Sequence, residues 1–221
     1  MAAKKATEEK VIAIRSLDIQ KVPIRIVGDT PLIVHAWSYK AKRQLMGELK
    51  ISKKEPRNPF YDFVNSMYWL DGVDPKDMTE DEYDELVKAG KARTGFTAYS
   101  VKMAGNAAAY RMGWVKNQTG LRGAYFINPL DDPEGDMAEI KGCLPVMRED
   151  MVKIGMGTAD IRWRPMYENW YMDLLLSYNA SGNISLDDIF NIINAGGYCV
   201  GIGEWRPEKD GKFGTYHVET I

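Results

Sequence analysis

The side chains with the most evident chemistry gather in one glycine-rich stretch, residues 196–214. Six glycines occur among these nineteen residues, so the backbone can adopt positive φ and approach a partner closely. Flat and cationic side chains alternate with the glycines: Trp205, Arg206, Lys209, Lys212 and Phe213. Aromatic rings stack on nucleobases and cations follow phosphates, whereas this stretch has no obvious nucleophile or cluster of metal ligands. It therefore predicts a loop whose exposed cations bind single-stranded nucleic acid; an ordinary exposed hairpin is the alternative.

Two further groups of cations could follow a phosphate chain. The first lies on a stretch with helical spacing and is interrupted by aromatic residues: Lys102, Tyr110, Arg111, Trp114, Lys116 and Arg122. The second could form a basic finger: Lys40, Lys42, Arg43, Lys53, Lys54 and Arg57. Helical spacing does not place all of the first group on one face, so a solvated surface is the alternative for both.

A fourth group of cations flanks a turn with two glycines, Gly155 and Gly157. Its members are Arg148, Lys153, Arg162 and Arg164. Such a turn can hold a phosphate on its backbone N–H groups. No segment matches a Walker loop, so we do not expect nucleotide hydrolysis.

Length and composition limit the class of protein. The 221 residues, 45% of them hydrophobic, fit one domain with an insertion. Two cysteines without a CxxC pair predict neither a disulfide framework nor a zinc site, and favour a reducing cytoplasm. The first ten residues lack the apolar run of a signal peptide, and no stretch approaches about 18 continuous apolar residues. We therefore expect a cytoplasmic protein without a membrane span, and we expect no cofactor.

The net charge of −2 conceals blocks of opposite sign. Residues 1–60 contain 13 lysines and arginines against 6 acidic residues, whereas residues 61–90 contain 2 against 9. Residues 91–125 contain 6 basic residues and no acidic ones. Such blocks can bind a polyanion locally and can pair one subunit with the next. They predict a homo-oligomer, either a ring or a filament, with solvated surface as the alternative.

The expected elements form two strand–helix–strand units. Residues 1–18 are expected to be a flexible arm, and residues 19–221 a single domain with an insertion at 52–95. Within the insertion, Thr79 and Glu82 form a capping-box pattern that starts an acidic helix. Strands are expected at 22–27, 32–37, 123–127, 139–147, 160–164, 169–178 and 213–218, and helices at 38–49, 97–112 and 186–195. The order predicts an α+β fold with a ferredoxin-like (RRM-like) βαββαβ core and an inserted helical arm.

The glycine-rich segment, here residues 196–218, lies between the second helix and the last strand of that core. In this placement, together with the opening strand at 22–34, the chain resembles the RAMP superfamily of CRISPR-associated RNA-binding proteins. The resemblance is to its backbone subunits, which polymerise along guide RNA. Residues 147–165 are similar to a family of uncharacterised bacteriophage-encoded proteins. Together these resemblances imply a phage-encoded protein of the host cytoplasm that assembles along single-stranded DNA or RNA.

The resemblance also implies two alternatives. Some RAMP members are metal-independent endoribonucleases that use a histidine as general acid and base, which makes His35 the catalytic candidate. The apolar neighbours of His35 equally predict a packed core side chain. The second alternative is a protein-binding inhibitor that mimics a CRISPR subunit through its acidic blocks. Our leading hypothesis is a non-enzymatic, single-stranded nucleic-acid-binding protein without a metal ion.

Overall fold

The centre of the computed structural model is a four-stranded antiparallel sheet. Its strands lie in the order β10 (Tyr216–Thr220), β1 (Ile19–Gly28), β9 (Tyr171–Asn179) and β5 (Tyr125–Pro129). The structure describes residues 16–37, 42–43, 45–47, 57–154 and 158–221. Alternate residues of β1 and β9 are buried, which is the period of two that a half-covered sheet requires.

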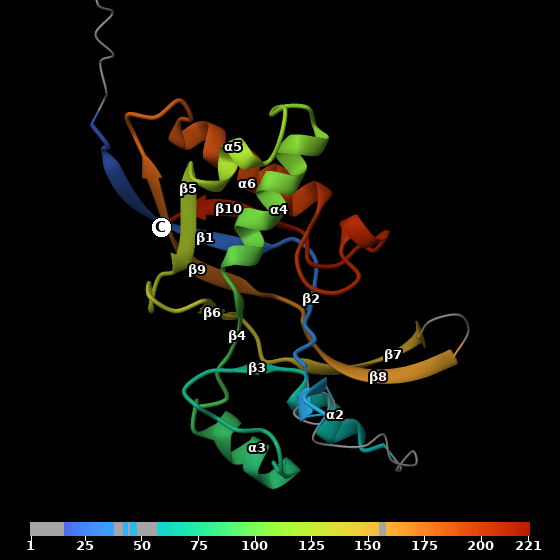
Figure 1. The fold of residues 1–221 in the computed structure, drawn as a ribbon. Coiled ribbons are helices and arrows are strands. Elements are labelled where there is room, and N and C mark those ends of the chain that lie inside the picture. Colours follow the sequence, from blue (N-terminus) through green and yellow to red (C-terminus); the bar gives the residue numbers. More distant parts are fainter. Residues whose placement is uncertain (1–15, 38–41, 44, 48–56, 155–157) are drawn as a thin grey trace, which may run out of the picture.

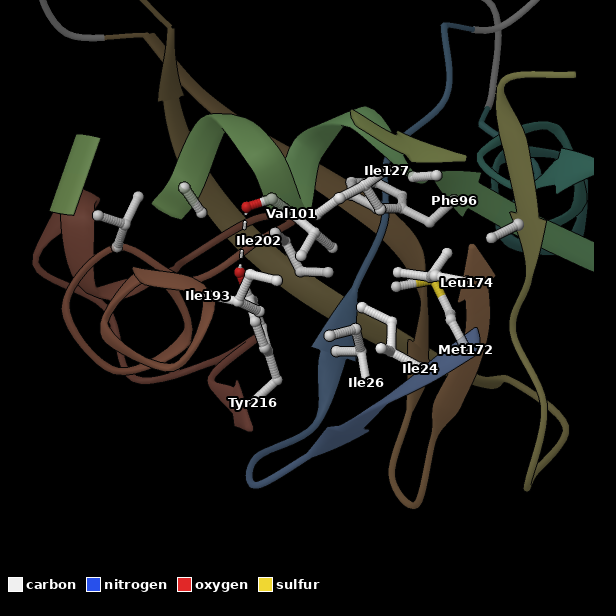
Figure 2. Packing of buried hydrophobic residues seen from close by; sticks show 14 of the residues in the cluster. Ile24, Ile26, Phe96, Val101, Ile127, Met172, Leu174, Ile193, Ile202 and Tyr216 are labelled. Carbon is white, nitrogen blue, oxygen red and sulfur yellow. Dashed lines mark hydrogen bonds between the residues drawn. The ribbon is translucent and has the colours of Figure 1, made fainter. Parts of the chain in front are cut away.

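Two helices, α4 (Tyr99–Arg111) and α6 (Leu186–Cys199), pack against each other and cover one face of this sheet (Figure 1). Side chains from the strands meet the helices in one apolar core; Figure 2 shows Ile24 and Leu174 on one side and Val101 and Ile193 on the other. The two helices approach closely because a glycine lies at their crossing: a Cβ on Gly196 would lie 2.5 Å from the backbone nitrogen of Gly105.

The last strand is closed along its outer edge by α6. The side-chain oxygen of Asn194 accepts a hydrogen bond from the backbone N–H of Val218 at 2.8 Å. A Cβ on Gly197 would lie 1.9 Å from the carbonyl oxygen of Tyr216, so only glycine lets the helix approach this strand. The helix therefore covers this edge at Tyr216 and Val218, where another strand would otherwise pair.

Two small sheets and further short helices complete the part of the chain that the structure describes. One sheet joins β2 (Leu32–Ile33) to a long hairpin of β8 (Thr158–Tyr167) and β7 (Val146–Ile154), which projects from the core in Figure 1. The other sheet joins β3 (Tyr68–Trp69), β4 (Thr94–Thr97) and β6 (Met137–Glu139). Beside them lie α2 (Pro59–Asn65), which packs on β8, and α3 (Glu80–Lys88), whereas the short α5 (Thr119–Arg122) lies beside α6 and β5 at the core (Figure 1). No helix in the described part of the chain has the length and apolar character needed to cross a bilayer.

Most of the expected elements are present, which confirms an α+β architecture. Thr79 and Ser185 cap α3 and α6 with complete capping boxes. The single strand expected at 139–147 is wrong, because β6 ends at Glu139 and β7 begins at Val146. Met112, expected on the inner side of its helix, is 42% exposed at the helix end. Most of the arm predicted at 1–18 and most of the helix expected at 38–49 lie outside the described residues.

Candidate nucleic-acid interface

A cleft of about 740 Å³ separates α4 from the glycine-rich loop between α6 and β10. Its walls carry cations from three parts of the sequence: Lys102 and Arg111 of α4, Arg122 of α5, and Arg206 of the loop. The aromatic side chains of Tyr68, Phe96 and Tyr99 also line it. The sequence assigned these cations to two separate groups; the fold brings them to one cleft, whose volume is in the range of about 300–1,000 Å³ typical of ligand sites.

One carboxylate joins two of the arginines that line the cleft. Glu208 lies in a short 3-10 turn, η1 (Pro207–Lys209), and its Oε1 accepts a hydrogen bond from Nη2 of Arg111 at 2.5 Å. Its Oε2 accepts from Nη2 and Nε of Arg206, at 2.7 and 3.1 Å. The hydrogen bonds from Arg206, and then those from Arg111, hold the pKa of the Glu208 carboxyl below its usual value.

Arg206 is not the freely exposed loop cation that the sequence predicts. Its side chain is 30% exposed, and its Nη1 donates to the carbonyl oxygen of Gly203 at 2.9 Å in addition to the bonds with Glu208. The guanidinium therefore holds the loop as well as facing the cleft. Replacing it would disturb both functions.

The glycines of the loop are explained by the loop's own folding. A Cβ on Gly211 would lie 1.7 Å from the carbonyl oxygen of Trp205, and one on Gly214 would lie 1.8 Å from that of Ile202. Three of the glycines have positive φ: Gly201, Gly203 and Gly214. Close approach to a ligand is thus not needed to account for these glycines. The loop is a tightly packed scaffold that presents its larger side chains.

Trp205 is the residue that this scaffold presents in the most unusual way. Its φ is 54°, a left-handed conformation that is uncommon for a bulky residue. Its carbonyl oxygen accepts from the backbone N–H of Phe213 at 3.0 Å, which fixes the turn. The side chain nevertheless remains 42% exposed. Strain of this kind persists where the surroundings impose it, and it often accompanies functional positions.

The hairpin and the loop meet at Phe213. The guanidinium carbon of Arg148, on β7, lies 4.8 Å from the centroid of the Phe213 ring, and Nζ of Lys212 lies 5.8 Å from it. Both are within the range of cation–π attraction. The sequence placed Arg148 and Phe213 in different groups of cations and rings; the fold makes them neighbours.

Arg164 is buried, although the sequence predicts that it binds a phosphate with the other cations around the turn at 155–157. Its side chain is 3% exposed, and its Nη1 lies 3.5 Å from Oδ2 of Asp150 and its Nη2 4.0 Å from Oε2 of Glu204. Within the part of the chain that the structure describes, Nε and Nη1 of Arg164 have no hydrogen-bond partner. Burial lowers the pKa of this guanidinium, and Glu204 opposes that effect. Arg164 is therefore inside the protein, behind the cleft.

The other predicted cations are dispersed. Lys209 and Lys212 are exposed, and Arg162 is half-buried with its Nε 3.6 Å from Oδ2 of Asp160. Lys102 is 9% exposed, and its Nζ donates to the carbonyl oxygen of Arg122 at 2.7 Å. In the second group, Lys42 is exposed and Arg43 half-buried, whereas Lys40 lies outside the described residues, as does the turn at 155–157.

His35 lines the cleft just after β2. Burial first, and then the charges of Arg164 and Arg162, lower the pKa of its imidazole to about 4. At neutral pH the ring is therefore uncharged, so it can accept a proton but has none to donate as an acid. His217 lies elsewhere, on β10, with its Nδ1 2.7 Å from Oδ1 of Asp29.

Sequence reasoning missed the acidic partners of the cleft, Glu204 and Glu208. The spacing of Arg206 and Glu208 within one short turn was the available signal. It also missed the two tyrosines of the cleft, Tyr68 on β3 and Tyr99 at the start of α4. Among the described residues, no group of three or more histidine, cysteine or acidic side chains is placed to hold a metal ion.

Comparison with known proteins identifies no family for this chain. No protein-family model and no curated protein matches this chain.

Proposed function

We propose that this protein binds single-stranded DNA or RNA in the cleft between α4 and the glycine-rich loop, without catalysing a reaction. The observation that carries the proposal is the convergence of Lys102, Arg111, Arg122 and Arg206 on one cleft that also has aromatic walls. Cations attract the phosphates of a strand, and exposed rings stack on bases with little dependence on sequence.

The exposed surface next to the cleft supports the same proposal. Trp205 is 42% exposed, and Lys209 and Lys212 are exposed on the same loop. A strand could therefore continue from the cleft across the loop towards Phe213 and Arg148. In this proposal Arg164 has a structural role, because it is buried, and Arg162 marks the far end of the surface.

The test is a titration of fluorescein-labelled oligo-dT and oligo-U with the purified protein, followed by anisotropy at several salt concentrations. Binding through phosphates should weaken as salt rises, with a log–log slope of about −0.7 for each phosphate contacted. A duplex of equal length is the control and should bind more weakly. Absence of binding to either single strand at low salt contradicts the proposal.

A ferredoxin-like type is the finer fold that we propose for the core. Its support is the order in which the core strands enter the sheet. Along the chain the core strands follow the order β1, β5, β9 and β10, with α4 between the first two and α6 between the last two. Across the sheet they lie in the order β10, β1, β9 and β5, so that the fourth strand of the core is next to the first and the third is next to the second. A ferredoxin-like core also favours assembly of several copies along one nucleic-acid strand, as the resemblance to RAMP backbone subunits implies.

A second candidate function, a metal-independent endoribonuclease, is favoured by the position of His35. Its neutral imidazole lines the cleft and could accept the proton of a ribose 2′-hydroxyl. The 2′-oxygen would then bond to the adjacent phosphorus as the bond to the 5′-oxygen breaks, and the imidazolium would return the proton to that leaving oxygen. Incubation with labelled oligo-U would then give products that end in a 2′,3′-cyclic phosphate. His35→Gln should abolish this cleavage while the protein keeps its circular dichroism spectrum. Intact oligo-U after prolonged incubation excludes this candidate.

A further inference from the structure

Arg111 and Arg206 reach the same point from distant parts of the chain. Arg111 is the last residue of α4, and Arg206 precedes the turn η1 in the loop. The Glu208 carboxylate lies between them, with one oxygen on each guanidinium, and the three side chains all line the cleft. Two guanidinium groups therefore face one anionic group at the cleft wall.

A phosphate matches the position of this carboxylate. Both groups accept paired hydrogen bonds from the planar donor fork of an arginine, and a phosphodiester carries the same single negative charge. Exchange of one for the other leaves the net charge of the arginine pair unchanged. Glu208 stands on a turn of three residues, and its side chain is 22% exposed, so it can rotate towards solvent when it is displaced.

We infer that Arg111 and Arg206 form a phosphate subsite of the cleft, and that Glu208 occupies this subsite until a nucleic-acid strand displaces it. This inference rests on the proposed function. Displacement requires other contacts, so a lone phosphate competes poorly with a carboxylate that is already tethered in place. A strand held at Lys102, Arg122 and the exposed loop supplies those contacts. The subsite is therefore selective for a polyanion over a free mononucleotide.

The experiment compares the Glu208→Gln variant with the wild type in anisotropy titrations with labelled oligo-dT and oligo-U. Glutamine keeps the shape and some hydrogen bonds but removes the negative charge. We expect Glu208→Gln to bind about tenfold more tightly, the size of one charge-assisted hydrogen bond. Its log–log salt slope should also be steeper by about 0.7, because one more phosphate contact forms without competition.

Asp210→Asn is the matched control. Asp210 is exposed on the same loop, has a φ of 57°, and asparagine accepts this left-handed conformation. The variant removes one negative charge two residues away from Glu208, so it measures the general effect of a less acidic loop. Because salt screens this charge, we expect the gain in affinity for the oligonucleotides to be below about twofold. In an Arg111→Ala background the gain from Glu208→Gln should shrink, since one of the two freed guanidinium groups is then missing.

Different results contradict the phosphate subsite and the proposed function. If the wild type binds and Glu208→Gln gains no more than Asp210→Asn, the subsite is wrong while the proposed function stands. If neither the wild type nor Glu208→Gln binds at low salt, the proposed function itself is wrong. Should Glu208→Gln lose its fold, Glu208→Asp replaces it: the shorter side chain cannot bridge both arginines, and tighter binding is again the supporting result.

Discussion

Trp205 and His35 are the two residues in which strain or burial is most closely linked to the candidate site. Trp205 is held in a left-handed conformation with an exposed ring, and His35 is half-buried and uncharged beside two arginines. Both arrangements are unfavourable for the isolated residue. Each can therefore be tested by a measurement of stability, which for Trp205 is combined with a measurement of nucleic-acid binding.

Replacement of Trp205 by glycine should separate binding from stability. Glycine relieves a left-handed strain of about 1–2 kcal/mol but loses the contacts of a partly exposed ring, so the free energy of unfolding should change by less than about 1 kcal/mol. Loss of one stacking platform should weaken binding of oligo-dT by about 1–3 kcal/mol. Trp37→Ala, at another exposed tryptophan (59%), is the control for nonspecific stacking. Equal losses in both variants would contradict a special role for Trp205.

The two histidines should shift the pH dependence of stability in opposite directions. The pKa of His35 falls from 6.5 to about 4 on folding, so the unfolded chain binds more protons between these values and stability is lost as pH falls from 6.5 towards 4. Asp29 raises the pKa of His217 above 6.5, so its contribution is present below 6.5 and is lost as pH rises through the raised pKa. In urea denaturation at several pH values, the free energy of unfolding of His35→Gln should fall less steeply between pH 6.5 and 4 than that of the wild type. His217→Gln should not show this change. If His35→Gln loses stability as steeply as the wild type between pH 6.5 and 4, the imidazole of His35 is not buried and uncharged.

At the scale of elements, the glycine-rich loop is a folded unit whose backbone packs on itself. Gly214→Ala would add a Cβ 1.8 Å from the carbonyl oxygen of Ile202 at a φ of 67°, so we expect a loss of several kcal/mol and weaker nucleic-acid binding. Gly120→Ala is the matched control, because nothing lies within 4 Å of its added Cβ and its φ is not positive. Thermal unfolding should show a large decrease for the first variant and almost none for the second.

The alternation of hydrophobic residues and the capping residues predict the core elements well. Ile24 and Ile26 are buried as the period of two requires, and Ser185 starts α6 as its capping box indicates. The end of α6 is missed, because Gly196 and Gly197 read as a loop whereas both lie inside the helix. Their lack of a side chain serves contact with α4 and β10, a tertiary cause that local sequence does not reveal.

The candidate site is predictable only in part, for a similar reason. Cations and rings identify the correct loop, but the sequence cannot show which of them become neighbours after folding. Arg111 and Arg206 are 95 positions apart and meet only because α4 packs beside the loop. Arg164 is predicted to bind a phosphate, yet its side chain is buried on the face of the hairpin that meets Glu204 of the glycine-rich loop. Such pairings depend on tertiary packing.

At the scale of the whole molecule, part of the charge alternation is neutralised within one copy of the chain. Arg25 pairs with Asp173 at 2.7 Å, and Arg93 with Glu139 at 2.8 Å. The acidic side chains of α3 remain exposed: Glu80, Asp81, Asp84 and Glu85. In the assembly that we propose, this acidic helix and the exposed cations are available for contacts between copies, whereas the cations that are already paired are not.

Self-association should also involve the hairpin face opposite Arg148 and Arg164. Met147, Met151 and Ile161 lie on one face of β7 and β8 and are 49%, 77% and 40% exposed. We expect Met151→Asp to shift the protein towards smaller species in sedimentation velocity, with and without oligo-dT. Tyr198→Asp, at an equally exposed position on α6 (79%), is the control and should not change the distribution. A wild-type protein that sediments as a monomer under both conditions contradicts assembly.

The position of β1 at the centre of the sheet has a consequence for synthesis on the ribosome. Ile24 pairs with Leu174 on one side and with Thr220 on the other, so both neighbours of this strand are made long after it. At a synthesis rate of roughly 5–20 residues per second, β1 emerges roughly 7–30 s before β9 and roughly 10–40 s before β10. During that time both of its edges are open, and an unpaired strand edge is a template for aggregation. The core sheet therefore forms late, and nascent chains stalled before residue 171 should lack it.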